Sequence, residues 1–267
     1  VINHYNTYFV PSNAYLVVIG DVKTADVKKK VEELFGADVW KKATAPNLTY
    51  NDPKDLQYSQ INFVDVPNAV QSEIALINLS KLKMNDKDYF AAILANQILG
   101  GGGEGRLFLN LREKHGWTYG SYSNLGASKY ISKFSSTASV RNAVTDSAVV
   151  EIFNELKRIR TDLVSAEDLK NAKAKYIGNF VMQIEKPATI ARYALNIKTL
   201  GLPEDFYENY VKNINAVTPE EIRNAANKYF LADNTRVVVV GKATEVLPGL
   251  EAMSAKEKMP IFYFDKF

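Results

Sequence analysis

Histidine and cysteine carry much of the hydrolytic chemistry of proteins at neutral pH, and this 267-residue chain has two histidines and no cysteine. A catalytic zinc ion commonly takes two histidines from one helix face plus a carboxylate, and keeps one position for water. His4 and His115 are far apart in the chain, neither has a second histidine four residues away, and no H-x-x-E-H arrangement occurs. The sequence therefore predicts no metal site in this chain. We interpret His115, beside Gly116 at a predicted helix end, as a cap favoured by the helix dipole.

Nucleophilic catalysis has no candidate either. The chain lacks a G-x-S-x-G elbow as well as cysteine, and neither histidine has an obvious serine partner. The glycine run followed by Glu104-Gly105-Arg106 resembles a phosphate loop only in its glycines. It lacks the Lys-Ser/Thr pair and follows a predicted helix rather than a strand, so a nucleotide site is not predicted.

The glycine run itself, Gly100 to Gly103, still requires a cause. Each glycine in regular structure costs roughly 0.5 to 1 kcal/mol relative to alanine. One interpretation is a loose connection between two helices. The other is a loop with exposed backbone along which an extended peptide can lie, because absent side chains let another main chain approach closely.

Composition narrows the class of protein. An apolar fraction of 46% and a charged fraction of 24% are typical of a globular protein with a substantial core. The net charge of +3 is too small and too dispersed to indicate nucleic-acid binding. No apolar run approaches the roughly 20 residues of a transmembrane helix. The absence of cysteine is compatible with both the bacterial periplasm and the cytoplasm, and the start at Val1 suggests a processed or truncated product.

Periodicity predicts the elements that would position these residues. Strands are expected at residues 58–66, 73–79, 118–125, 131–140 and 236–240. Helices are expected at residues 24–35, 85–99 with Asn85 as cap, 106–115, 144–161, 166–183, 188–200, 205–213, and 219–229 after a Thr218 cap. Strands from both ends with helices between them predict an α+β fold, in which helices cover one face of a mostly antiparallel sheet. The tail at 261–264 is expected to pack back on this unit, or else to form a strand between lobes.

An internal repeat suggests that the chain contains parts of two similar units. Tyr8-Phe9 begins a segment that ends at Gly20, and Tyr229-Phe230 begins one that ends at Gly241. The two lie 229 − 8 = 221 residues apart without a gap. Each copy is predicted to contain a helix end, a turn with Asn, a β-branched strand and a closing glycine. We therefore assign residues 1–50 to the tail of a first, truncated lobe plus a linker, and residues 51–267 to a second αβ lobe.

The segment after the glycine run resembles a known family. Arg106-Leu107-Phe108 continues into Leu111-Arg112-Glu113 and ends at Tyr119, which gives the pattern R-L-F-x-x-L-R-E-x-x-G-x-x-Y. This pattern is similar to the second-half signature of the insulinase-like zinc peptidases, the family of pitrilysin and the mitochondrial processing peptidase. The stretch from Tyr5 to Asp21 and the pair Gln71-Ser72 also resemble segments of that family. The resemblance identifies the chain as the C-terminal, non-zinc-binding half, with an αβ roll.

The resemblance also implies roles for particular residues. In that family the zinc motif lies in the first lobe, while the second lobe contributes an Arg and a Tyr seven residues apart, here Arg112 and Tyr119. Arg112 would donate a forked pair of hydrogen bonds to a peptide carbonyl or carboxylate, and Tyr119 a phenol hydrogen bond to the developing oxyanion. Gly100 to Gly103 would bind the peptide backbone. Zinc would belong to the complete enzyme and not to this chain.

Two functions stay open at this point. The first is the substrate-binding lobe of a zinc endopeptidase that cleaves unfolded peptides, inactive alone because a missing N-terminal lobe or a partner subunit supplies the zinc site. The second is a non-catalytic peptide-binding or scaffolding subunit with the same fold. The identity of the peptides and the oligomeric state cannot be inferred from the sequence.

Overall fold

The computed structural model describes residues 1–36, 38–40, 43–49 and 51–264. The chain forms two compact units, one of Val1–Asp52 with Gly178–Glu208 and one of Pro53–Ile177 with Asn209–Phe267. The grouping of Gly178–Glu208 with the first segment was not anticipated from the sequence. The assignment of residues 1–50 to another lobe stays a prediction.

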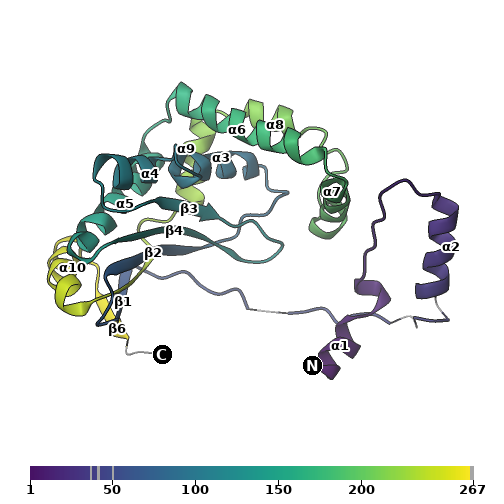
Figure 1. The fold of residues 1–267 in the computed structure, drawn as a ribbon, viewed down its shortest axis with the longest axis horizontal. Helices are drawn as coiled ribbons and strands as arrows, with labels where there is room; N and C mark the ends of the chain where they lie inside the picture. Colours follow the sequence, from purple (N-terminus) through teal and green to yellow (C-terminus); the bar gives the residue numbers. More distant parts are fainter. Residues whose placement is uncertain (37, 41–42, 50, 265–267) are drawn as a thin grey trace. The chain divides into compact units, whose positions relative to one another are not determined.

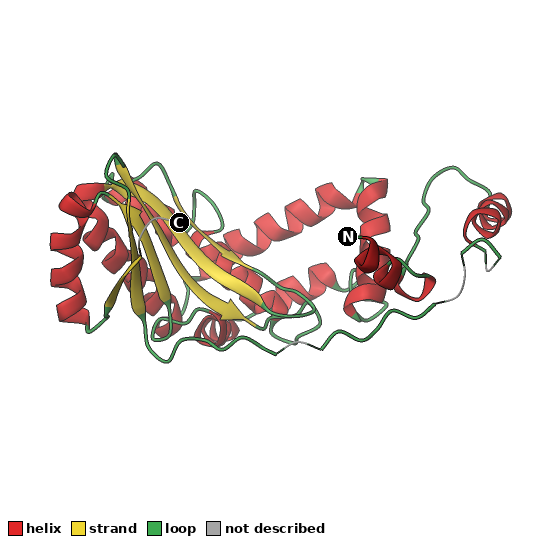
Figure 2. Cartoon of the chain, turned by 90° about the horizontal axis from the view of Figure 1, so that it is seen from below, coloured by secondary structure: helices red, strands yellow, loops and turns green. Residues whose placement is uncertain are grey.

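A six-stranded sheet forms the centre of the second unit, with the strand order β3-β4-β2-β5-β1-β6 (Figures 1 and 2). Its strands are β1 Gln60–Asp65, β2 Gln71–Ser80, β3 Ser121–Leu125, β4 Ser132–Arg141, β5 Arg236–Gly241 and β6 Ile261–Phe264. β2 is antiparallel to β4 and β5, and β3 to β4, whereas β1 is parallel to β5 and β6. Three of the five pairs are antiparallel, which confirms the predicted sheet. The tail packs back on its own unit as the edge strand β6.

Helices cover one face of this sheet (Figure 1). The covering layer includes α3 Tyr89–Gly100, α5 Thr145–Thr161 and α9 Pro219–Tyr229, and α3 packs against both α9 and β3. β2 alternates accordingly, because Ile74 and Leu76 are buried towards the helices while Ala75 and Ile77 are partly exposed. The predicted α+β architecture is therefore confirmed. Within the described ranges, none of the helices combines the length and apolar character needed to span a bilayer.

Local capping explains where prediction of the helices succeeded and failed. At α9 the Thr218 hydroxyl accepts from the Glu221 amide at 3.2 Å and the Glu221 carboxylate accepts from the Thr218 amide at 2.9 Å, which confirms the capping box. Asn85 is not a cap, and that prediction was wrong. The Asp86 carboxylate instead accepts from the Lys83 amide at 2.9 Å and closes a turn, so α3 begins at Tyr89.

Two further elements, α8 and β3, begin later than predicted, and one helix was not predicted. α8 spans Tyr210–Ala216 rather than 205–213, because a turn follows Pro203. β3 begins at Ser121 because residues 118–120 form a turn. The helix α10, Ala243–Glu257, was not predicted, and it contains Pro248, a residue that disfavours a helix interior. Its burial of Val246, Leu250 and Met253 and its packing on α5 outweigh that local signal.

The first unit is mostly helical. It contains α1 Ile2–Tyr8, a 3₁₀ turn at Pro11–Asn13, α2 Thr24–Phe35, the C-terminal end of α6 Ala166–Ile184, and α7 Pro187–Leu200. α2 has the predicted bounds. The predicted strand before Gly20 was wrong, since the described part of the chain has no strand over residues 14–20. A strand requires a hydrogen-bonding neighbour, and sequence pattern alone cannot supply one.

Candidate functional site

The glycine run closes tightly after α3. Gly100 is buried, and a Cβ atom there would lie 2.5 Å from the backbone nitrogen of Ser123 on β3. Gly102 has φ of +152°, a conformation that L-residues rarely adopt, and its carbonyl accepts from the Gly105 amide at 2.9 Å. Gly103 is exposed. Two of the glycines therefore meet steric demands of the turn, and Gly103 presents bare backbone.

Helix α6 holds this loop from outside. The Lys175 ammonium donates to the Gly101 carbonyl at 3.3 Å and would lie 2.7 Å from a Cβ atom at Gly102. Arg106, just after the loop, lies 3.6 Å from the Asp168 carboxylate, also on α6. These contacts favour a fixed loop over a loose connection between helices.

Arg112 lies on a π-helical turn. The predicted helix at 106–115 is in fact one α-helical turn, α4 Arg106–Phe108, followed by a π-helix at Leu109–Lys114. The guanidinium of Arg112 lies 4.7 Å from the centroid of the Phe108 ring, and its Nε atom lies 3.6 Å from the Glu113 carboxylate. About half of the side chain (47%) is exposed. The planar group is thus held on an aromatic face while much of its surface stays open to a ligand. π-helical turns are frequent at functional sites.

Tyr119 projects from the turn that leads into β3. It is 88% exposed. The backbone around it is held by the Thr118 hydroxyl, which donates to the Gly120 carbonyl at 2.9 Å and accepts from the Gly120 amide at 3.1 Å. A Cβ atom at Gly120 would lie 2.6 Å from the Tyr122 hydroxyl oxygen, so Tyr122 packs closely on this turn. The phenol of Tyr119 is therefore exposed on an ordered backbone.

Phe108 connects these features. The centroid of its ring lies 5.9 Å from that of Tyr122, and the guanidinium of Arg112 lies over its face. A Cβ atom added at Gly103 would lie 3.7 Å from the same ring. The candidate site residues Arg112 and Gly103 thus share one aromatic neighbour, and Tyr122 links it to the turn that bears Tyr119. Sequence reasoning did not select Phe108, Tyr122 or Lys175 as site residues. The available signal was the alternation of β3, which exposes Tyr122 between buried Ser121 and Ser123.

Comparison with known proteins identifies the family. A family model described as the peptidase M16 inactive domain matches residues 1–176. The chain belongs to this family. The match confirms the resemblance to insulinase-like zinc peptidases, and it makes the chain an inactive, C-terminal-type M16 domain of a zinc-protease-like family.

Relatives support this assignment. A probable inactive metalloprotease, YmfF, from Bacillus subtilis is 24% identical over 213 residues, which covers 80% of this chain and 48% of the relative. An uncharacterized zinc protease from Rickettsia bellii is 27% identical over 257 residues, covering 88% and 54%. The crystal structure of a peptidase M16 inactive domain from Pseudomonas fluorescens has the same fold, with a TM-score of 0.74 and 24% identity, covering 84% and 52%. The M16 domain described here spans about half the length of the curated relatives it matches.

The described residues of this M16 domain do not form a set of ligands that fits zinc. Among the residues that the structure describes, no group of three or more His, Asp or Glu side chains is placed to hold a metal ion. His115 stacks on Trp117 with ring centroids 4.0 Å apart, and its Nε2 atom is buried. We therefore assign His115 a packing role at the end of the π-helix.

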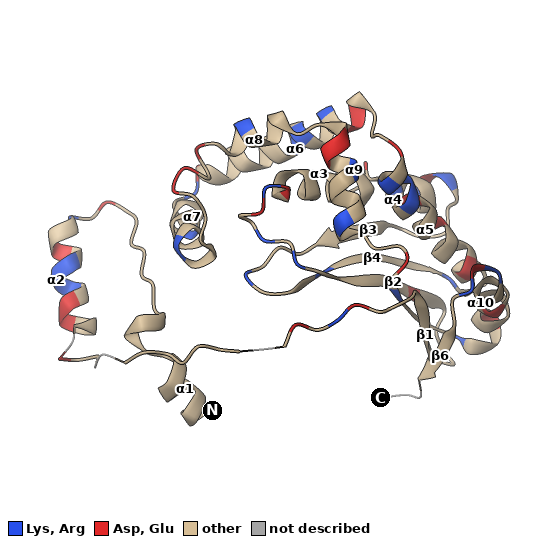
Figure 3. Ribbon diagram, turned by 180° about the vertical axis from the view of Figure 1, so that it is seen from behind, with Lys and Arg blue, Asp and Glu red and all other residues tan. Residues whose placement is uncertain are grey.

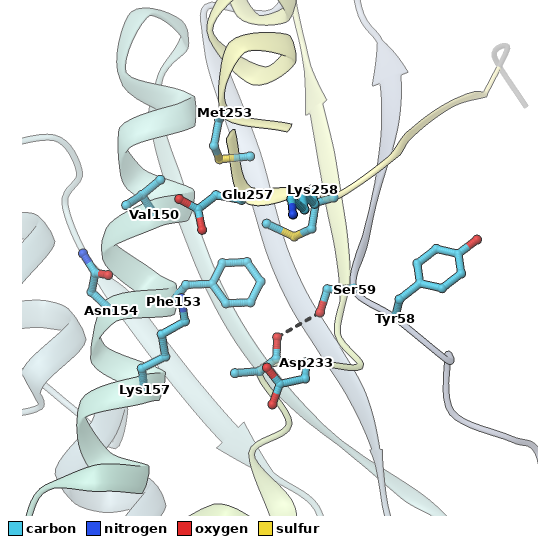
Figure 4. Close-up of a pocket in the computed structure, with 12 residues that line it drawn as sticks. Tyr58, Ser59, Val150, Phe153, Asn154, Lys157, Asp233, Met253, Glu257 and Lys258 are labelled. Atoms are coloured by element: carbon cyan, nitrogen blue, oxygen red, sulfur yellow. Dashed lines mark hydrogen bonds between the residues drawn. The ribbon is translucent and has the colours of Figure 1, made fainter. Parts of the chain in front are cut away.

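A cavity of about 270 Å³ lies elsewhere in the M16 domain, between α5, α10 and the start of β1 (Figure 4). Its apolar lining includes Phe153, Met253 and Met259, and its charged lining includes Lys157 and Glu257. The Ser59 hydroxyl donates to the Ala232 carbonyl at 2.8 Å beside it. Neither Arg112 nor Tyr119 lines this cavity, so the cavity is separate from the candidate site.

Proposed function

We propose that this M16 inactive domain is the substrate-binding lobe of a zinc-dependent endopeptidase that cleaves unfolded peptides. The zinc site is supplied by a missing N-terminal lobe or by a partner subunit. The observation that carries the proposal is the exposure of two hydrogen-bond donors, Arg112 and Tyr119, on ordered backbone.

Each residue has a defined task in this proposal. The Arg112 guanidinium donates two parallel hydrogen bonds to a carbonyl or carboxylate of the bound peptide. The Tyr119 phenol donates to the oxygen that gains negative charge at the scissile carbonyl, where one such donor is worth roughly 100- to 1000-fold in rate. Gly101 to Gly103 lie along the peptide backbone, and buried Gly100 fixes the end of α3 that carries them.

The second candidate function is a non-catalytic peptide-binding or scaffolding subunit. A chain of complex III2 from Candida albicans has a similar fold, with a TM-score of 0.69 and 11% identity, covering 94% of this chain and 61% of that chain. Likeness at this level of identity concerns the fold alone.

Reconstitution separates the two functions. The zinc-bearing polypeptide encoded upstream of this chain or beside it, recognised by its H-x-x-E-H, is mixed with the chain, and cleavage of an unfolded fluorogenic peptide is followed. The enzyme hypothesis predicts no cleavage by either part alone and cleavage by the mixture. An assembled complex that binds the peptide but never cleaves it would contradict the proposal and favour the scaffold.

A further inference from the structure

A buried amide lies on the same π-helical turn as Arg112. Asn110 is 8% exposed, whereas the side chain of Arg112 is 47% exposed. Residues two apart do not share a face of a helical turn, so the two side chains leave it in different directions. One side of the turn therefore presents the candidate site residue, and another side is buried within the unit.

Helix α5 receives this amide. The NH2 group of Asn110 donates to the Glu151 carboxylate at 2.8 Å and to the Glu155 carboxylate at 2.9 Å. The two glutamates are four residues apart on α5 and so share one face of that helix. An ionised carboxylate only accepts hydrogen bonds, so the amide can meet both carboxylates only through its NH2 group. Its orientation is therefore fixed.

Glu155 is an expensive partner for packing alone. Its side chain is 9% exposed, and within the described residues its Oε2 atom has no hydrogen-bond partner. The nearest cation on α5 is the Arg158 guanidinium, 3.8 Å away and mostly exposed. Figure 3 shows acidic and basic residues along α5, beside α4. An apolar pair would fill the same space without the cost of a buried charge, whereas a buried polar network can specify a single arrangement.

The apolar side chains of this segment do not select the π-helical form. Leu107 and Leu111 are both fully buried, and their spacing of four residues suits an ordinary α-helix equally well. Apolar packing tolerates a small rotation of the turn, because it has no preferred direction. The two hydrogen bonds of Asn110 do not tolerate it, because a rotation would carry the amide away from the carboxylates.

The backbone of the turn is closed around these two residues. The His115 amide donates to the Asn110 carbonyl at 3.1 Å, five residues back, which is the hydrogen bond of a π-helix. The Gly116 amide donates to the Arg112 carbonyl at 2.9 Å, and the φ of +64° at Gly116 ends the turn. Asn110 and Arg112 are thus joined through one short, hydrogen-bonded stretch of main chain.

We propose that Asn110, held by Glu151 and Glu155, is the positioning residue for Arg112. Its grip on α5 selects the π-helical form of the turn and so directs the Arg112 guanidinium over the Phe108 ring, 4.7 Å from the ring centroid. The importance of this position for peptide cleavage rests on the proposed function. The position itself does not, and it can be measured in the chain alone.

The first test is nuclear magnetic resonance of the full chain. Side-chain protons of Arg112 that lie over an aromatic ring resonate upfield, and the signal is assigned by its absence in Arg112→Lys. Asn110→Leu should lose most of this upfield shift. Asn142→Leu is the matched control, because Asn142 is also a buried amide (5% exposed) and donates to the Glu245 carboxylate at 3.1 Å. The control should keep the shift.

A second variant separates position from stability. Asn110→Leu leaves the Glu155 carboxylate without its donor, and Glu155→Leu in the same chain removes that unpaired charge, so the double variant should fold with little change in Tm. Glu151 keeps its hydrogen bond from Asn154 at 3.1 Å. We expect the double variant to lose the Arg112 shift as Asn110→Leu does. In the assembled enzyme its kcat/KM for an unfolded peptide should fall about 10- to 100-fold, against less than about twofold for Asn142→Leu.

A wild-type Arg112 shift in the double variant would overturn the inference. A wild-type kcat/KM of that variant in an assembled, cleaving complex would also overturn it. Loss of the shift in the double variant, when even the wild-type complex cleaves no peptide, would support the positioning role and contradict only the proposed function. Restored Tm together with a lost shift is the result that a merely structural role of Asn110 does not produce.

Discussion

Substitution of Gly100 by alanine tests whether the glycine run is a fitted part of the fold. The added Cβ atom would lie 2.5 Å from the Ser123 nitrogen, 2.7 Å from the Ser123 hydroxyl and 2.8 Å from Leu107 Cδ1. The Ser123 nitrogen belongs to the paired strand β3, and the Leu107 side chain is fully buried, so neither atom can move freely. Overpacking costs about 1–3 kcal/mol, and three contacts below 3 Å place this site in the upper part of that range. The helix preference of alanine subtracts roughly 0.5–1 kcal/mol, so the net loss is about 1–2.5 kcal/mol.

Gly178 provides the matched control. It lies inside α6, and a Cβ atom there would meet nothing within 4 Å among the described residues. Gly178→Ala should therefore stabilise the chain by roughly 0.5–1 kcal/mol. The assay is urea and thermal unfolding followed by circular dichroism. Gly100→Ala should lower Tm by about 2 to 10 °C while Gly178→Ala raises it slightly. Equal or greater stability of Gly100→Ala would refute the close approach of α3 to β3.

Three further predictions concern the loop, the pH dependence and metal. Lys175→Met should speed amide hydrogen exchange at residues 101–105, because the hydrogen bond from Lys175 to the Gly101 carbonyl is lost. Lys170→Met, on the exposed side of α6, should leave this exchange unchanged. Equal exchange in the two variants would contradict the anchoring role of Lys175. Burial, together with the hydrogen bond to Asp88, raises the pKa of Tyr229 to about 12, above its usual value of about 10. The protonated Tyr229 thus contributes fully to the free energy of unfolding below pH 10, and this contribution is lost as the pH rises towards 12. Between pH 10 and 12 the free energy of unfolding should therefore fall less steeply with pH in Tyr229→Phe than in the wild type. Identical slopes would disprove this. Treatment with EDTA should leave Tm unchanged and elemental analysis should find zinc well below one ion per chain; one retained zinc per chain would contradict the absence of a site.

The fold could be predicted where local signals agree with tertiary packing. The apolar spacing of Thr24–Phe35 and the capping box at Thr218 are complete within a few residues, so both helices were found with their bounds. The alternation in β2 predicted a sheet with one covered face. Helix α10 was not predicted; it contains Pro248, whose local cost is offset by the burial of Leu250 and its neighbours. Residues 14–20 have the pattern of a strand, but the described residues give them no partner.

The site could be predicted only in part. Arg112 and Tyr119 were selected from a resemblance, since an exposed arginine and an exposed tyrosine have no local signal that separates them from ordinary surface residues. The contacts that define their surroundings are not local: Lys175 reaches Gly101 from α6, and the Phe108 ring meets Tyr122 on β3. The π-helical turn was also missed, because its sequence has the apolar spacing of an ordinary helix.

The central claim is that Arg112 and Tyr119 act on a peptide in the assembled enzyme. The most direct measurement is kcat/KM for an unfolded peptide with Arg112→Ala and Tyr119→Phe, against Arg141→Ala and Tyr58→Phe as exposed controls on the same unit. We expect losses of about 100-fold or more for the first pair, with unchanged assembly and stability, and less than about twofold for the controls. Full activity of Arg112→Ala and Tyr119→Phe in an assembled, peptide-cleaving complex would contradict the account.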